Sequence, residues 1–178
     1  MPFTDAQIKA LSAKLNAKHV KTRQADGITL SYIEGWHVVA EANRIFGFDG
    51  WDRKTVMADC IWRGQINGRP ACLYVARVAI TVRADEAIVV REGSGAGHRA
   101  ADTIGEAHEK ALKEAETDAT KRALSTFGNS FGLALYDKKQ RAVRGKPKVP
   151  NGSVSAPMQV KCPFVSATGD TLDKYADP

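Results

Sequence analysis

The feature that most constrains the fold is a row of alanines inside a long helical segment. The segment runs from Thr103 to about Phe127, and at every fourth position it carries Ala107, Ala111, Ala115, Ala119 and Ala123. Residues four apart lie on one face of a helix, and such small side chains let that face approach a sheet or another helix closely. We therefore expect a long helix whose alanine face packs against a flat surface.

The segment before this helix has the pattern of β-structure. Residues 51–64 and 71–83 flank Asn67-Gly68, a dipeptide typical of hairpin turns. A third strand over 86–92 follows a short turn at Ala84-Asp85. The sequence thus predicts an α+β fold, a three-stranded antiparallel β-meander with one long helix packed on it.

Two more helices are expected nearer the N-terminus, because the spacing of a capping box recurs. The pairs are Thr4 with Gln7, Ser31 with Glu34, and, for the long helix, Thr103 with Glu106. The first helix would carry Ile8, Leu11 and Leu15 on one face. The second would run from about Tyr32 to Phe46 and end at Gly47 in a left-handed cap.

Composition limits the class of protein. The chain has 178 residues, 43% of them apolar, which suits one domain with an appendage. We expect neither a membrane span nor a secretory signal. Cys60, Cys72 and Cys162 share no metal-type spacing, which favours a reducing, intracellular compartment. A net charge of +6 and a pI near 9.3 favour an anionic partner.

The chain divides by composition into two parts. Residues 1–145 carry the predicted helices and strands, whereas 146–178 begin basic and continue rich in Pro, Gly and Ser. We expect the second part to be a flexible tail. Its end holds Phe164, Val165 and Tyr175, so it is either unstructured or a segment that docks on a partner.

Lys121 and Arg122 stand side by side near the end of the long helix. At about 100° per residue, Arg122 falls on the side of Ala111 and Ala115, and Lys121 about a quarter turn away. Two interpretations are open. In the first, the cations offset the helix dipole and Arg122 pairs with Asp118. In the second, they form the edge of a phosphate-binding site.

The glycine-rich stretch Glu92–His98 invites a nucleotide loop. Such a loop needs a helix directly after it and, ideally, Gly-Lys-Ser/Thr, but here no Lys-Ser/Thr follows and the helix begins only at Thr103. We expect a flexible turn or hairpin tip with Arg99 exposed.

No catalytic or metal-binding set emerges from the sequence. His108 and Glu109 are adjacent on the helix and diverge, and the His-Glu-x-x-His spacing is lacking. No Ser/His/Asp or Cys/His set can be assigned. The sequence therefore predicts a protein that is not an enzyme and needs no metal or cofactor.

The aromatic residues near Phe46–Trp51 allow two readings. We expect them to belong to the core, together with Trp36 and Trp62. Aromatic rings beside a basic groove could instead stack on nucleobases.

Two segments together resemble a known family. LSYIEGWHVVAEANRIFGFDGW and EAETDATKRALSTFGNSFGLALYDK are similar, in this order and around a β-meander, to the signature segments of the Rad52/Rad22 family of single-strand annealing proteins. The resemblance covers about Leu15 to Arg141, the N-terminal oligomerisation and annealing domain of that family. The larger C-terminal region of eukaryotic members has no counterpart, so we expect a bacterial or phage member, in the cytoplasm of a bacterial or phage-infected cell.

The resemblance implies a multisubunit ring. Single-stranded DNA would lie in a positively charged outer groove with its bases outward, and no nucleotide or metal would be consumed. Lys121 and Arg122 match inner DNA-binding positions, Tyr32 matches the groove tyrosine, and Arg23 matches an upstream groove arginine after a one-residue gap.

Two positions depart from the family pattern. Ser125 stands where members can have a third arginine. For a second, outer DNA site, Arg69 falls near the hairpin lysine, but the next lysine is replaced by Asp102. Arg99 is a weaker candidate to compensate for that charge reversal.

The function implied is ATP-independent binding of single-stranded DNA and annealing of complementary strands, in homologous recombination and double-strand break repair. One alternative is a ring-shaped DNA-bound scaffold or mediator that recruits a recombinase or single-strand-binding protein through residues 146–178. Another is a nuclease or nucleotide hydrolase that uses the glycine-rich stretch.

Overall fold

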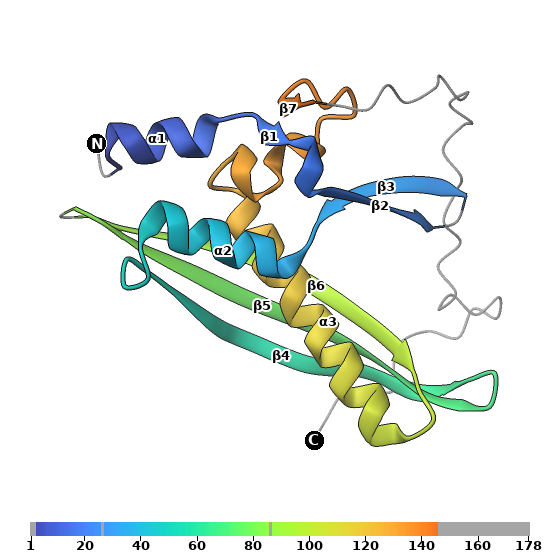
Figure 1. Cartoon of the computed structure of the whole chain (residues 1–178). Helices are drawn as coiled ribbons and strands as arrows, with labels where there is room; N and C mark the ends of the chain where they lie inside the picture. The colour runs from blue at the N-terminus through green and yellow to red at the C-terminus, as the bar shows by residue number, and fades with distance from the viewer. Residues whose placement is uncertain (1–2, 26, 86, 146–178) are drawn as a thin grey trace, which may run out of the picture. The chain divides into compact units, whose positions relative to one another are not determined.

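An antiparallel three-stranded sheet organises the computed structural model, which describes residues 3–25, 27–85 and 87–145 (Figure 1). The elements, in chain order, are α1 Asp5–Ser12, β1 Leu15–Asn16, η1 Ala17–His19, β2 Val20–Ala25, β3 Ile28–Ile33, α2 Gly35–Phe46, β4 Trp51–Ile66, β5 Arg69–Ala84, β6 Ala87–Ala100, α3 Ile104–Ser125, η2 Asn129–Phe131, η3 Leu133–Leu135 and β7 Val143–Arg144.

The predicted meander is confirmed. The strands pair in the order β4-β5-β6, both pairs antiparallel. Asn67 and Gly68 connect β4 to β5 with φ values of 52° and 76°, the conformation that Asn-Gly adopts readily in a hairpin turn. Asp85, with φ 53°, turns the chain from β5 into β6. The α+β class read from the sequence is therefore correct.

The glycine-rich stretch is not a turn, contrary to expectation. It lies inside β6, which continues to Ala100 rather than ending at Glu92. A Cβ atom on Gly93, Gly95 or Gly97 would overlap main-chain atoms of α3, at Ala111, Ala115, Ala119 and Ala123. Alternate glycines on one strand thus face the alanine row, and the helix backbone lies almost directly on the sheet.

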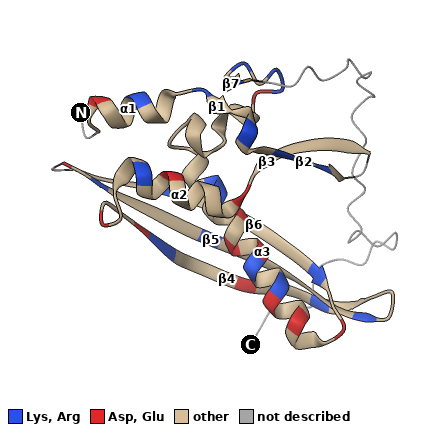
Figure 2. Cartoon of the chain, in the orientation of Figure 1, with Lys and Arg blue, Asp and Glu red and all other residues tan. Residues whose placement is uncertain are grey.

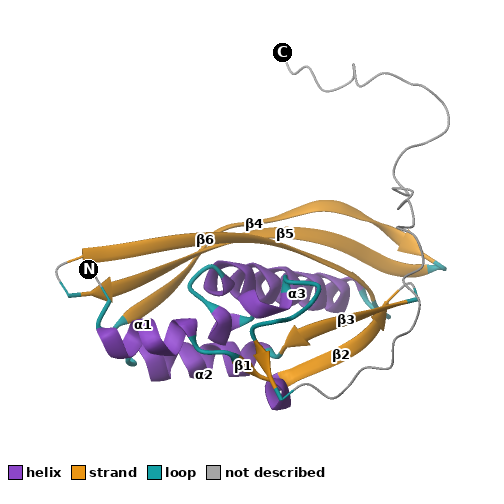
Figure 3. Cartoon of the chain, turned by 90° about the horizontal axis from the view of Figure 1, so that it is seen from above, coloured by secondary structure: helices purple, strands orange, loops and turns teal. Residues whose placement is uncertain are grey.

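Helix α3 is the middle of three layers. In the view from above (Figure 3), the sheet lies on one side of α3, while α1, α2 and the β2–β3 hairpin lie on the other. The alanine row is fully buried against the sheet, together with Val78, Ile80 and Val82 of β5. On the other side, Phe46 stacks on Phe131 with ring centroids 5.7 Å apart, which anchors α2 to η2.

The second helix starts later than its sequence suggested. Ser31 and Glu34 do not form a capping box, because Ser31 lies in β3 and α2 begins at Gly35 with Glu34 as its N-cap. Residues 28–33 pair with 20–25 in an antiparallel hairpin that the sequence analysis did not predict. Gly47 does end α2 with a positive φ of 88° and donates its N–H to the Asn43 carbonyl at 3.0 Å, but its ψ of 159° differs from the left-handed helical cap that was expected.

The first helix forms as expected, with the Thr4–Gln7 capping box complete. Leu15 is not part of it, however. Leu15 starts β1, which pairs in parallel with β7 so that Leu15 lies opposite Val143. This two-residue ladder joins the beginning and the end of the described chain.

The assignment of all three tryptophans to the core was wrong for Trp36. Its side chain is in the first turn of α2 and the residue is 66% exposed, because the next two residues, His37 and Val38, take the buried side of that turn. Phe48 is also exposed, at 87%, whereas Trp51 and Trp62 are partly buried.

Cys60 and Cys72 lie in strands as free thiols, as expected, and burial raises the pKa of the Cys72 thiol. Cys162 and the predicted tail over 146–178 lie outside the described residues. No helix in the described part of the chain is long and apolar enough to cross a membrane.

Candidate nucleic-acid interface

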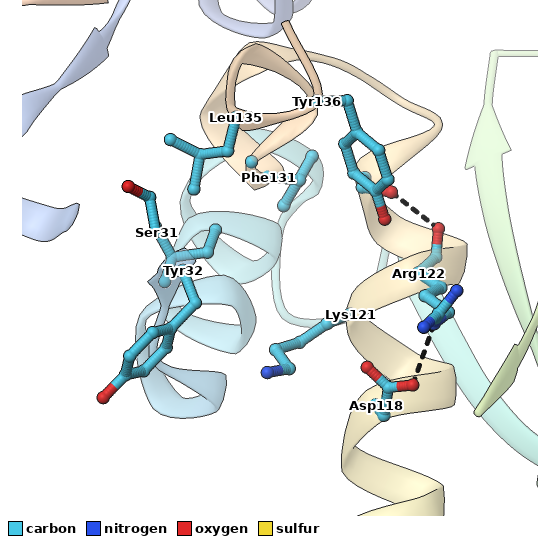
Figure 4. Close-up of a pocket in the computed structure, with 11 residues that line it drawn as sticks. Ser31, Tyr32, Asp118, Lys121, Arg122, Phe131, Leu135 and Tyr136 are labelled. Atoms are coloured by element: carbon cyan, nitrogen blue, oxygen red, sulfur yellow. Dashed lines mark hydrogen bonds and ion pairs between the residues drawn. The ribbon is translucent and has the colours of Figure 1, made fainter. Parts of the chain in front are cut away.

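A hollow of about 210 Å³ opens where β3, α3 and the chain after α3 meet (Figure 4). We call it the Tyr32 hollow. It is lined by Ser31, Tyr32, Ile33, Asp118, Lys121, Arg122, Ser125, Phe131, Gly132, Leu135 and Tyr136. Three of the residues proposed from the sequence, Tyr32, Lys121 and Arg122, are thus brought together from segments far apart in the chain.

Lys121 supplies available positive charge to this hollow. Its Nζ atom lies 5.9 Å from the centroid of the Tyr32 ring, within the range of a cation–π interaction. In Figure 4 its side chain points across the hollow toward that ring. Within residues 3–25, 27–85 and 87–145 it forms no ion pair. Its charge is therefore free to meet an anion.

Arg122 is partly committed. Its Nε donates to Asp118 Oδ2 at 2.8 Å, one turn earlier on the exposed side of α3. This hydrogen bond, and the charge of the same carboxylate, raise the pKa of Arg122. The pairing expected of a helix end is thus present, and Arg122 also belongs to the lining of the hollow. Lys121 and Arg122 point in different directions, as helical geometry predicted (Figure 4).

The β2–β3 hairpin extends the positive surface. Arg23 pairs across the ladder with Leu30, and Lys21 lies directly opposite Tyr32. Residues opposite each other, or two apart on one strand, share a face, so Lys21 and Arg23 lie on the Tyr32 face of the hairpin. Both are exposed, and Arg23 does not line the hollow itself. Figure 2 shows the cationic positions along β2.

Lys21 was missed by the sequence analysis. Its position follows only from the ladder register that sets it opposite Tyr32. Two short segments, 20–25 and 28–33, flank Gly27, where φ is 75°. Two such segments around a glycine turn were the signal that could have revealed the hairpin.

The candidates for an outer site lie elsewhere. Arg69 pairs with Asp102 at 2.8 Å, and Arg99 pairs with Glu114 at 2.8 Å. The Arg69–Asp102 pair lies just before α3, whereas Glu114 lies midway along it, about 10 Å of helix rise before Lys121. The structure does not bring Arg69 or Arg99 to the Tyr32 hollow, and a neighbouring carboxylate compensates each.

Ser125, where the family can have arginine, is buried in the wall of the Tyr32 hollow. Its hydroxyl donates to the Arg122 carbonyl at 2.8 Å. The side chain closes the helix end and adds no charge. Among the described residues, no three His, Cys, Asp or Glu side chains gather as metal ligands would.

Comparison with known proteins gives a consistent set of relatives. The sequence model described as "Rad52/22 family double-strand break repair protein" matches residues 4–154. The DNA repair and recombination protein rad22 of Schizosaccharomyces pombe is 37% identical over 144 residues, which cover 79% of this chain and 30% of that protein. The DNA repair and recombination protein RAD52 of Saccharomyces cerevisiae is 38% identical over 138 residues, covering 75% and 28%.

The similarity extends to the DNA repair and recombination protein rti1 of S. pombe, 31% identical over 148 residues that cover 77% of this chain and 38% of that one. The chain thus spans between 28% and 38% of the length of these three relatives. The family match includes β3, α3 and the chain after α3, the segments that build the Tyr32 hollow. The chain belongs to the Rad52/22 family of double-strand break repair proteins.

Proposed function

We propose that this protein binds single-stranded DNA and anneals complementary strands, without ATP, in recombination and double-strand break repair. The observation that carries the proposal is the Tyr32 hollow, in which Lys121, without an ion pair among the described residues, lies 5.9 Å from an aromatic ring of another segment. Its relatives are named as DNA repair and recombination proteins.

The chemistry of the hollow suits a DNA backbone. Lys121 and Arg122 would hold phosphates, Arg23 and Lys21 would continue that track along the hairpin, and Tyr32 would shape the groove. Contacts to phosphates position a strand without reading its sequence. Base edges would therefore stay free to find a complement.

Assembly of several copies into a ring is part of the proposal. One hollow with few cations would bind weakly. Copies joined in a ring would place many such hollows along one strand, and the gain is avidity rather than new chemistry.

The first test is the annealing of two complementary fluorescent oligonucleotides in EDTA without nucleotide. We expect acceleration well above the spontaneous rate, and a loss of about 10-fold or more in single-strand affinity for Lys121→Ala, because a charge-assisted contact is removed. Lys110→Ala is the matched control, since Lys110 lies on the same helix but is paired with Glu106 at 3.0 Å. Equal annealing by wild type and Lys121→Ala would refute the assignment.

Salt dependence gives a second test. Affinity should fall by about 0.7 log units per log unit of salt for each phosphate contacted. A flat response would contradict a phosphate-tracking site. Tight single-strand binding without annealing would favour the alternative, a DNA-bound mediator or scaffold that recruits a recombinase or single-strand-binding protein. Deleting 146–178 should then abolish partner loading.

A further inference from the structure

A second hollow adjoins the first one. It has a volume of about 380 Å³ and is lined by Gly35, Trp36, Val39, Arg53, Lys113, Glu116, Thr117, Thr120 and Lys121. We call it the Trp36 hollow. Lys121 belongs to the walls of both, so a strand held at the Tyr32 hollow would pass this lysine to enter the next.

Trp36 is an exposed ring held in a fixed place. The residue is 66% exposed, yet its indole Nε1 donates to Glu34 Oε2 at 3.2 Å, and its ring meets the His37 ring edge-on with centroids 5.6 Å apart. Gly35 lets the start of α2 approach α3 closely, since a Cβ there would lie only 3.2 Å from Thr117 Cγ2. An aromatic face is thus open to solvent but held at a fixed position above α3.

The cations of the Trp36 hollow exceed its available acids. Arg53 is occupied, with its Nε bonded to Thr120 Oγ1 at 2.8 Å and its Nη2 3.6 Å from Glu116. The same Glu116 carboxylate also accepts from Thr55 Oγ1 at 2.6 Å. Lys113 and Lys121 form no ion pair within the described part of the chain. In the described structure, two ammonium groups without an ion pair therefore share this hollow with an exposed indole.

We propose that the Trp36 hollow binds the next stretch of single-stranded DNA, with one nucleobase stacked on the Trp36 indole and phosphates held by Lys113 and Lys121. Stacking on an aromatic side chain tolerates any base, because every base has a π-face. It also leaves the hydrogen-bonding edge of the base exposed. The inference rests on the proposed function and specifies how the same path continues.

Charge and continuity favour DNA over a second protein copy as the occupant. A protein surface covering Trp36 would bury Lys113 and Lys121 unless it brought matching acids, since an unpaired buried charge is costly. DNA supplies one anion per nucleotide, and the adjoining Tyr32 hollow is already its proposed site.

The test separates stacking from phosphate contact. Binding of an oligonucleotide and of an abasic oligonucleotide of equal length is measured for wild type, Trp36→Ala, Trp36→Phe and Phe48→Ala. Phe48 is the matched control, an aromatic that is 87% exposed at the other end of α2 and lines neither hollow. Trp36→Ala should weaken binding of the base-bearing strand about 5-fold or more and leave abasic binding unchanged. Trp36→Phe should retain part of the affinity.

Three results would overturn the inference. Equal affinity of wild type and Trp36→Ala, with Lys121→Ala still impaired, would remove the stacking site and leave the proposed function intact. Equal weakening for both oligonucleotides, with fewer subunits by light scattering, would show that Trp36 contacts another copy. Absence of single-strand binding by the wild type would sink the proposed function as well.

Discussion

The arginines beside the first half of α3 and the cations of its last turns differ in what surrounds them. Before α3 and along its first half, Arg69 and Arg99 are each paired with a carboxylate, of Asp102 and of Glu114, at 2.8 Å. Near its end, Lys121 faces an aromatic ring and forms no ion pair within the described residues, and only Arg122 is paired. Positive residues mark a candidate phosphate site most clearly where their charge is not already compensated, and in the last turns of α3 Lys121 meets that condition within the described residues.

The largest effect should come from disturbing the packing of α3 on the sheet, because this packing supports both regions of the helix. Gly95→Ala places a methyl group where α3 main-chain atoms of Ala115 and Ala119 lie. We expect a loss of at least about 1–3 kcal/mol in the free energy of unfolding, because overpacking displaces the helix. Chemical denaturation measures it.

Gly105→Ala is the control for that substitution. A Cβ at Gly105 meets no atom within 4 Å, and the residue lies in the first turn of α3. The change should be neutral or stabilising, since alanine favours a helix over glycine. Unchanged stability of Gly95→Ala would mean that helix and sheet do not pack backbone to backbone.

The next substitutions leave the arginines beside the first half of α3 without their carboxylate partners, which is the situation of Lys121 among the described residues. Asp102→Asn with Glu114→Gln frees Arg69 and Arg99 from their partners. Single-strand affinity should rise up to about 5-fold at 0.1 M salt, and its salt dependence should steepen by about 0.7 log units for each arginine that gains a phosphate. Fluorescence anisotropy over a salt series measures both. No change would indicate that position, as well as pairing, keeps these arginines from DNA.

A smaller gain in single-strand affinity is expected in the last turns of α3, which line the proposed DNA site. Asp118→Asn removes the carboxylate that accepts from Arg122 Nε at 2.8 Å. Because a phosphate then no longer competes with an exposed ion pair, affinity should increase about 2-fold, in the range of such pairs. The measurement is the single-strand affinity of Asp118→Asn, compared with that of the double variant Asp118→Asn with Lys121→Ala. Weaker binding would mean that Asp118 positions Arg122.

The smallest effect should be a pH dependence of stability that arises from the buried His37. His37 is 7% exposed, and its ring stacks on His19 with centroids 4.0 Å apart. Burial, and next the charge of His19, lower the pKa of His37 below 6.5; Glu41 and Glu34 oppose that shift and Arg44 adds to it. The unfolded chain therefore binds this proton more readily than the folded one.

It follows that the contribution of His37 to stability is fully present above pH 6.5 and is lost as the pH falls from there toward its folded-state pKa. Thermal melts between about pH 7.5 and 5.5 should show Tm falling with pH in wild type. His37→Gln should flatten that slope, whereas His98→Gln, an exposed histidine on β6, should not. An unaltered slope in His37→Gln would contradict the prediction.

Local pattern was sufficient for the meander and α3. Asn67-Gly68 and the alanine row act over a few residues, so their consequences are visible without tertiary information. The β2–β3 hairpin was missed because Ser31 and Glu34 imitate a capping box one turn before the true helix start. The glycines of β6 were interpreted as a flexible turn. They are needed because the backbone of α3 lies against them, and α3 comes later in the chain.

The same distinction applies to the site. Tyr32, Lys121 and Arg122 were found from segment similarity, and the fold brings them to one hollow. What the sequence did not indicate is the ion pairing of Arg69 and Arg99, the position of Lys21 or the exposure of Trp36. Each of these depends on a partner from another segment, and such contacts exist only after folding.

The parallel ladder of β1 and β7 has a consequence for the order of assembly. Strands β4 to β6 and helix α3 are contiguous in the chain and can pair with short loop closures, whereas Leu15 must find Val143 across most of the described sequence. Contacts at such separation form late. The Tyr32 hollow needs β3 from before the meander and Tyr136 from after α3. During synthesis, the lysine-bearing helix would therefore dock on its sheet well before the hollow that it lines is complete.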